Sequence, residues 1–87
     1  MVSKVTKVTN EMGFHMRPAN IFVTAMAKYT SNINIIASDK KINGKSIMNI
    51  MAACIKCGTE ITVECDGTDE QAMLDEAIAL IESGFGE

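Results

Sequence analysis

The sequence is short of several residue types, and each shortage narrows the classes of protein that it can encode. Its 87 residues include one histidine and no tryptophan, and no run of about 18 apolar residues occurs. We therefore expect no membrane-spanning helix. Residues 1–6 lack the apolar core of a signal peptide, which predicts a cytoplasmic protein. A net charge of −3 without a basic run argues against nucleic acid as a partner.

Cysteine is also scarce. The three cysteines are Cys54, Cys57 and Cys65, and without an export signal we expect reduced thiols. Cys54 and Cys57 form a C-x-x-C, a spacing that can bind metal or carry out redox chemistry. Small metal-chaperone domains carry this motif in their first strand-to-helix loop, where this chain has residues 13–18. A tetrahedral zinc site needs a fourth ligand, and His15 is the only histidine, so we expect no metal and no cofactor.

The rest of the composition is that of a globular domain, with 47% hydrophobic and 22% charged residues. No linker, repeat or low-complexity segment divides the chain, so we expect one domain over residues 1–87. Four segments have the composition or alternation of β-strands: residues 2–9, 33–37, 41–43 and 61–65. Residues 10–13 form the first loop, and residues 38–40 form a turn that pairs the second and third strands as a hairpin.

Three segments have the spacing of amphipathic helices. The first runs from residue 16 to about residue 29, and the second starts after Ser46, a good N-cap residue, and ends near Gly58. The third begins at a capping box formed by Thr68 and Gln71 and ends at Gly84. The order β-α-β-β-α-β-α predicts a two-layer α/β sandwich with a four-stranded antiparallel sheet. The buried stripes comprise Ala19, Phe22, Val23 and Met26 in the first helix and Leu74, Ala77, Ile78 and Ile81 in the third.

Residues 13–18, Gly-Phe-His-Met-Arg-Pro, stand where the first helix begins. Pro18 is tolerated in a helix's first turn. If the helix starts at Met16, His15 is its N-cap. The backbone N–H groups of Met16 and Arg17, the helix dipole and the Arg17 guanidinium then form a site for a phosphate-sized anion. The alternative is that His15 is a solvated loop residue, because glycine, proline and arginine are common at helix boundaries.

The second helix carries more apolar bulk than one face of a short helix can bury. Four large apolar residues fall within five positions: Ile47, Met48, Ile50 and Met51. We expect some of them to be exposed, and an exposed methionine-rich patch is an adaptable docking surface.

These two regions resemble the two signatures of the HPr family, the histidine-containing phosphocarriers of the bacterial sugar phosphotransferase system. The first signature matches residues 13–19 and the second matches residues 43–51, and the resemblance covers essentially the whole chain. It implies an open-faced β-sandwich with sheet order 1-4-2-3 and three helices on one face.

The resemblance also implies roles for the matching residues. His15 would accept a phosphoryl group through Nδ1, and Arg17 would steady it. Ser46 would be phosphorylated by an ATP-dependent regulatory kinase. The partner-docking residues would be Asn20, Ile47, Met48 and Met51. The implied protein is a monomeric carrier rather than an enzyme, and its partners are enzyme I, enzyme IIA domains, a serine kinase/phosphorylase and a catabolite-control transcription regulator.

Some positions depart from the family pattern. Met16 stands where alanine, serine or threonine is usual, Asn49 where glycine is common, and Cys54 and Cys57 where cysteine is rare. Two other functions stay open: a purely regulatory module that acts through phosphorylated Ser46, and a metal or redox domain that uses the C-x-x-C. Regulatory-only relatives lack the histidine, so its presence here favours the carrier.

Overall fold

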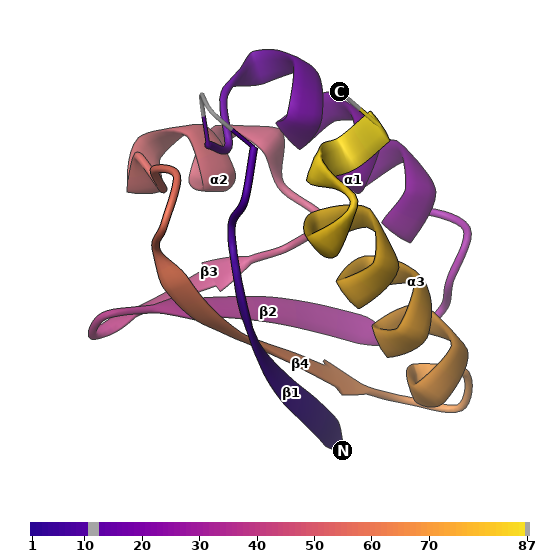
Figure 1. Cartoon of the computed structure of the whole chain (residues 1–87). Coiled ribbons are helices and arrows are strands. Elements are labelled where there is room, and N and C mark those ends of the chain that lie inside the picture. Colours follow the sequence, from indigo (N-terminus) through magenta and orange to yellow (C-terminus); the bar gives the residue numbers. More distant parts are fainter. Residues whose placement is uncertain (11–12, 87) are drawn as a thin grey trace.

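The computed structural model describes residues 1–10 and 13–86. Its elements are, in chain order, β1 (Val2–Lys7), α1 (Met16–Met26), β2 (Asn32–Ala37), β3 (Lys40–Asn43), α2 (Ile47–Ala53), β4 (Glu60–Asp66), α3 (Glu70–Glu82) and the 3-10 helix η1 (Gly84–Gly86). The strands form one antiparallel sheet in the order β1-β4-β2-β3. Helices α1, α2 and α3 lie over the same face of this sheet (Figure 1). The predicted fold class and sheet order are confirmed.

The core lies between the sheet and the helices. Ile61, Val63 and Cys65 of β4 are buried and alternate with more exposed neighbours, which gives the strand one inward face. The predicted stripes of α1 and α3 are also buried, except that Val23 is only partly covered, and Met73 joins the stripe of α3. No helix among the described residues combines the length and apolar character that crossing a bilayer requires.

Several element boundaries differ from the predictions. Strand β1 ends at Lys7 instead of residue 9, α1 ends at Met26 instead of about residue 29, β3 begins at Lys40 instead of residue 41, and α2 ends at Ala53 instead of near Gly58. Helix α2 stops because Cys54 adopts a left-handed conformation, with φ 53° and ψ 48°. The chain then turns and buries Ile55 in the core. Residues 11 and 12 of the predicted first loop lie outside the described residues.

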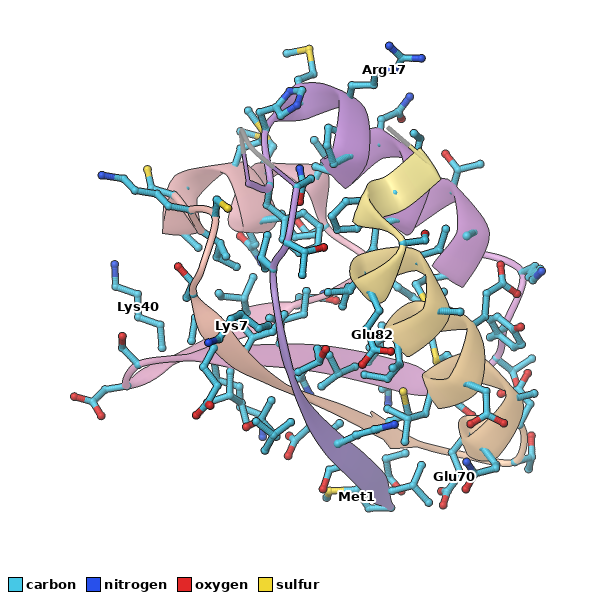
Figure 2. All side chains as sticks on the ribbon, viewed as in Figure 1. Met1, Lys7, Arg17, Lys40, Glu70 and Glu82 are labelled. Carbon is cyan, nitrogen blue, oxygen red and sulfur yellow. The ribbon has the colours of Figure 1, made fainter. Side chains whose placement is uncertain are left out.

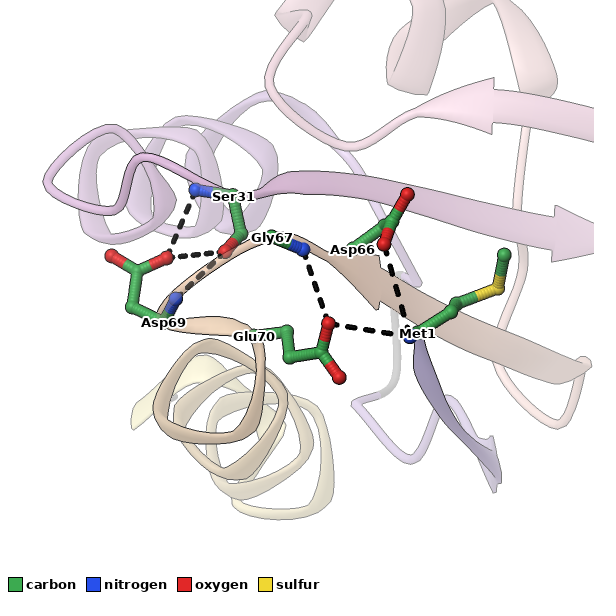
Figure 3. A network of polar contacts seen from close by, with 6 residues as sticks. All are labelled: Met1, Ser31, Asp66, Gly67, Asp69 and Glu70. Atoms are coloured by element: carbon green, nitrogen blue, oxygen red, sulfur yellow. Dashed lines mark hydrogen bonds and ion pairs between the residues drawn. The ribbon is translucent and has the colours of Figure 1, made fainter.

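The predicted capping box at the start of α3 is wrong. Asp69, not Thr68, is the N-cap residue, and no side chain caps this helix. The Asp69 carboxylate instead accepts hydrogen bonds from the Ser31 hydroxyl and from the backbone N–H groups of Ser31 (2.9 Å) and Thr30 (3.0 Å), as Figure 3 shows for Ser31. These bonds, led by that of the Ser31 hydroxyl, lower the pKa of Asp69 to about 2. Asp69 therefore ties the loop before β2 to the start of α3.

Glu70 makes a second connection at the same end of the molecule. It occupies the first turn of α3, where a carboxylate is favourable. It accepts a hydrogen bond from the Gly67 N–H (3.1 Å) and pairs with the α-amino group of Met1 at 3.3 Å (Figure 3). Gln71, the other expected member of the capping box, donates to Asp75 (2.9 Å) instead.

Candidate functional site

His15 is the N-cap of α1, as predicted. Its backbone is extended, with φ −85° and ψ −172°, and its imidazole makes no capping hydrogen bond. Its carbonyl accepts the N–H of Ala19 (3.0 Å), which closes the first turn of the helix. The residue is partly exposed. The ring therefore lies at the positive end of α1 and within reach of solvent.

The loop before His15 is supported by the loop between α2 and β4. Gly13 has a φ of +68°, and a Cβ added there would meet the Ile55 carbonyl and lie 2.8 Å from the Lys56 Cα. The Phe14 N–H donates to the same Ile55 carbonyl at 2.9 Å. Only glycine fits this approach, because both the backbone conformation and the space exclude a side chain.

The three phenylalanines of the chain pack together next to His15. Phe14 contacts Phe22 of α1 edge-on, with 5.5 Å between ring centroids, and contacts Phe85 of η1 at 4.7 Å. All three rings are buried. Each such aromatic pair contributes about 0.5–1.5 kcal/mol beyond the area that it buries. Phe14, the residue directly before His15, is thus held by ring contacts with two separate helical segments.

The first turn of α1 offers two backbone donors to an anion. The first N–H groups of a helix have no partner within the helix, and here they belong to Met16 and Arg17, because Pro18 has no N–H. No acidic residue occupies this turn. Arg17 is exposed, and Figure 2 shows its side chain extending away from the body of the molecule. The arrangement favours a dianion such as a phosphoryl group beside His15.

A surface hollow of about 660 Å³ lies next to the ring. Its lining residues are His15, Met16, Arg17 and Asn20, with Ile47 from α2. The structure therefore brings two of the predicted docking residues, Asn20 and Ile47, to His15. The other two predicted docking residues, Met48 and Met51, do not line this hollow. A second hollow of about 660 Å³, between β1 and α3, contains none of the predicted site residues.

The remaining apolar residues of α2 divide between core and surface. Ile50 is buried, Met51 is partly buried against the core, and Met48 is 81% exposed. The prediction that this helix cannot hide all of its apolar residues is confirmed.

Ser46 is the N-cap of α2, as predicted. Its hydroxyl oxygen accepts a hydrogen bond from the Asn49 N–H at 3.2 Å. It directly precedes Ile47, which lines the hollow together with His15.

The three cysteines are free thiols in different surroundings. Cys54 and Cys57 are exposed on the loop between α2 and β4, whereas Cys65 is buried in β4. Within residues 1–10 and 13–86, no three histidine, cysteine, aspartate or glutamate side chains are grouped so that they could hold a metal ion.

One supporting residue of the site was not predicted, and a second, Met16, was expected to donate its backbone N–H and was noted as a departure from the family pattern. Ile55 holds Gly13 and Phe14 in place, and no local pattern could reveal this contact between segments far apart in the chain. Met16 is 68% exposed and lines the hollow. Its signal in the sequence is that it is a large apolar residue outside the buried stripe of its helix.

Comparison with known proteins agrees with this geometry. Residues 2–83 match the family model of the PTS HPr component phosphorylation site. The phosphocarrier protein HPr of Mycoplasma capricolum is 46% identical over 79 residues, which are 82% of this chain and 89% of that protein. The HPr-like protein Crh of Halalkalibacterium halodurans is 42% identical over 94% of this chain and 98% of its own. A crystal structure of HPr from Thermoanaerobacter tengcongensis matches with a TM-score of 0.96 at 37% identity, covering 100% of this chain and 98% of that one. On sequence and structure together, the chain belongs to the HPr family of phosphotransferase-system phosphocarriers.

Proposed function

We propose that His15 accepts a phosphoryl group from phosphorylated enzyme I and passes it to sugar-specific enzyme IIA proteins. The observation that carries this proposal is the position of His15 at the positive end of α1, in one hollow with the exposed Arg17. The protein is a carrier rather than an enzyme, because each partner protein supplies the rest of an active site around the same ring.

The chemistry requires a nucleophile before transfer and a leaving group afterwards. Histidine supplies a nucleophilic ring nitrogen, and the Nδ1 of His15 attacks phosphorus as the donor's bond to phosphorus breaks. The Met16 and Arg17 N–H groups and the Arg17 guanidinium then stabilise the phosphate oxygens. Because His15 is partly exposed, the next protein can reach the phosphoryl group and remove it.

Labelling with phosphoenolpyruvate and enzyme I tests this proposal. Wild type should gain acid-labile phosphate, and His15→Ala should gain none while keeping its circular dichroism spectrum and melting temperature. Arg17→Ala should keep the acceptor but transfer about tenfold more slowly or worse, because charged hydrogen bonds contribute about 1.5–3 kcal/mol. Lys40→Ala is the matched control, since it removes one exposed positive charge away from Arg17 (Figure 2). Undiminished labelling of His15→Ala would overturn the carrier function.

We propose that Ser46 is a regulatory phosphorylation site, linked to carbon catabolite control through a serine kinase/phosphorylase and a transcription regulator. A phosphate on Ser46 would lie at the N-terminus of α2, so it should not unfold the domain. It would also lie beside Ile47, where a partner that covers the hollow must desolvate the charge. This desolvation penalty can reach a few kcal/mol, and each loss of about 1.4 kcal/mol lowers the affinity for the partner tenfold.

The corresponding test compares two aspartate variants. Ser46→Asp should slow transfer to His15 at sub-saturating carrier, more weakly than the phosphate itself. Ser3→Asp adds the same charge at an exposed position of β1, and this variant should transfer phosphate like wild type. Equal transfer rates for the two variants would contradict the docking-surface explanation, and a large loss of melting temperature in Ser46→Asp alone would indicate helix disruption instead.

We propose that partners dock over the hollow and the exposed side of α2, on Asn20, Ile47, Met48 and Met51. Alanine substitutions there should raise the partner concentration needed for half-maximal transfer and leave the rate at saturation unchanged. The carrier is expected to act as a single-domain monomer in the cytoplasm. Size-exclusion chromatography tests this expectation, and a concentration-independent dimer would contradict it.

A further inference from the structure

Two of the three thiols lie on the loop that supports the site. Cys54 and Cys57 are both exposed and stand on either side of residues 55 and 56. Cys65 differs, because burial raises its pKa to about 11 and so keeps the thiol protonated near neutral pH. The chain therefore holds one accessible pair of thiols and one inert thiol.

The segment between the accessible thiols contacts the residues that precede His15. The Ile55 carbonyl accepts the Phe14 N–H at 2.9 Å and faces Gly13, where no space remains for even a Cβ. On the other side of the segment, the Gly58 N–H donates to the Val8 carbonyl at 2.8 Å. Any change in the shape of this loop therefore reaches the segment that leads into His15.

We propose that Cys54 and Cys57 form a reversible redox pair whose disulfide slows phosphoryl transfer at His15. The oxidant is a small-molecule disulfide of the glutathione class. One cysteine thiolate attacks it and releases one glutathione thiol, and the second cysteine displaces the other. One S–S bond breaks and one forms, each cysteine sulfur loses one electron, and the two cysteine protons end on two glutathione thiols. The effect on transfer rests on the function proposed above.

The disulfide replaces two hydrogen bonds that the thiols make in the reduced loop. In the reduced form the Cys54 thiol lies 3.7 Å from the Met51 carbonyl oxygen, and the Cys57 thiol lies 3.7 Å from the Thr9 carbonyl oxygen. Both S–H donors are lost when the sulfurs join at about 2.05 Å, so neither contact persists as a hydrogen bond. The ring that closes contains Ile55, and we expect its carbonyl to shift relative to Phe14.

The consequence for transfer follows from this movement. A misplacement of about 1 Å at a reacting group can cost about a hundredfold in rate. We expect transfer from enzyme I to fall at least about tenfold in the oxidised protein.

The experiment exposes the full chain to oxidised glutathione and follows three readouts. Intact mass should fall by two hydrogens, with peptide mapping that joins Cys54 to Cys57 and leaves Cys65 as a thiol. The amide NMR signals of Gly13 and Phe14 should shift, and transfer should slow. Dithiothreitol should reverse all three changes. Cys54→Ser and Cys57→Ser can each bind one glutathione but cannot close an internal disulfide, so each should transfer like reduced wild type before and after treatment.

Three results would overturn the proposal. The first is a protein that stays fully reduced, the second is glutathione bound to one cysteine without an internal disulfide, and the third is an internal disulfide with unchanged Gly13 and Phe14 signals or an unchanged transfer rate. If the reduced protein itself accepts no phosphate, the carrier function fails instead. Mass and NMR then decide by themselves whether the redox pair exists.

Discussion

Replacing Gly13 with alanine should destabilise the protein far more than the same change at Gly58. Both glycines have positive φ, +68° and +86°. A side chain in this left-handed region costs roughly 1–2 kcal/mol, and this cost applies to both positions. At Gly58 nothing lies within 4 Å of the added Cβ. At Gly13 the Cβ meets backbone atoms of Ile55 and Lys56, which cannot rotate away, and overpacking adds about 1–3 kcal/mol.

The expected loss of unfolding free energy is therefore about 1–2 kcal/mol for Gly58→Ala and about 2–5 kcal/mol for Gly13→Ala. Urea denaturation followed by circular dichroism measures both values, and melting temperature should fall roughly 4–8 °C for each kcal/mol. Gly13→Ala should also slow transfer to His15, whereas Gly58→Ala should not. Equal stability losses in the two variants would refute the conclusion that Gly13 is held against the loop between α2 and β4.

Two further predictions concern the N-cap of α2 and the hydrogen bonds of Asp69 at the start of α3. Ser46→Ala removes the acceptor of the Asn49 N–H and should cost about 1 kcal/mol in thermal denaturation, whereas Ser46→Asp keeps a capping oxygen and should stay near wild type. The pKa of Asp69 is about 2 in the folded protein, below its ordinary value of 3.8, so the charged carboxylate stabilises the fold fully above about pH 4. This contribution should be lost as the pH falls from about 4 towards about 2. Urea titrations should show that the free energy of unfolding of Asp69→Asn depends less on pH in this range than that of wild type. An identical pH dependence would mean that the hydrogen bonds from Ser31 do not contribute to stability.

Local patterns in the sequence were sufficient for the element order and for the N-cap residues of α1 and α2. Alternation along residues 61–65 marked a buried strand, and helical spacing after Met16 marked α1, because both repeats follow from backbone geometry alone. The same holds for His15 and Ser46 as N-caps, since a cap interacts with residues at most four positions away. The sheet order and the residue roles came from the resemblance to a family.

Contacts between distant segments decided what the sequence could not show. Threonine is a common N-cap residue, but Asp69 rather than Thr68 is the N-cap of α3, and its carboxylate binds Ser31, 38 residues away. Helix α2 ends at Ala53, before the expected glycine, because Cys54 adopts a left-handed conformation, and the turn that follows buries Ile55. That burial places the Ile55 carbonyl against Gly13 and brings the exposed C-x-x-C next to the site. A sequence pattern records periodicity along one segment, whereas these features depend on how two segments pack in space, which only the tertiary structure determines.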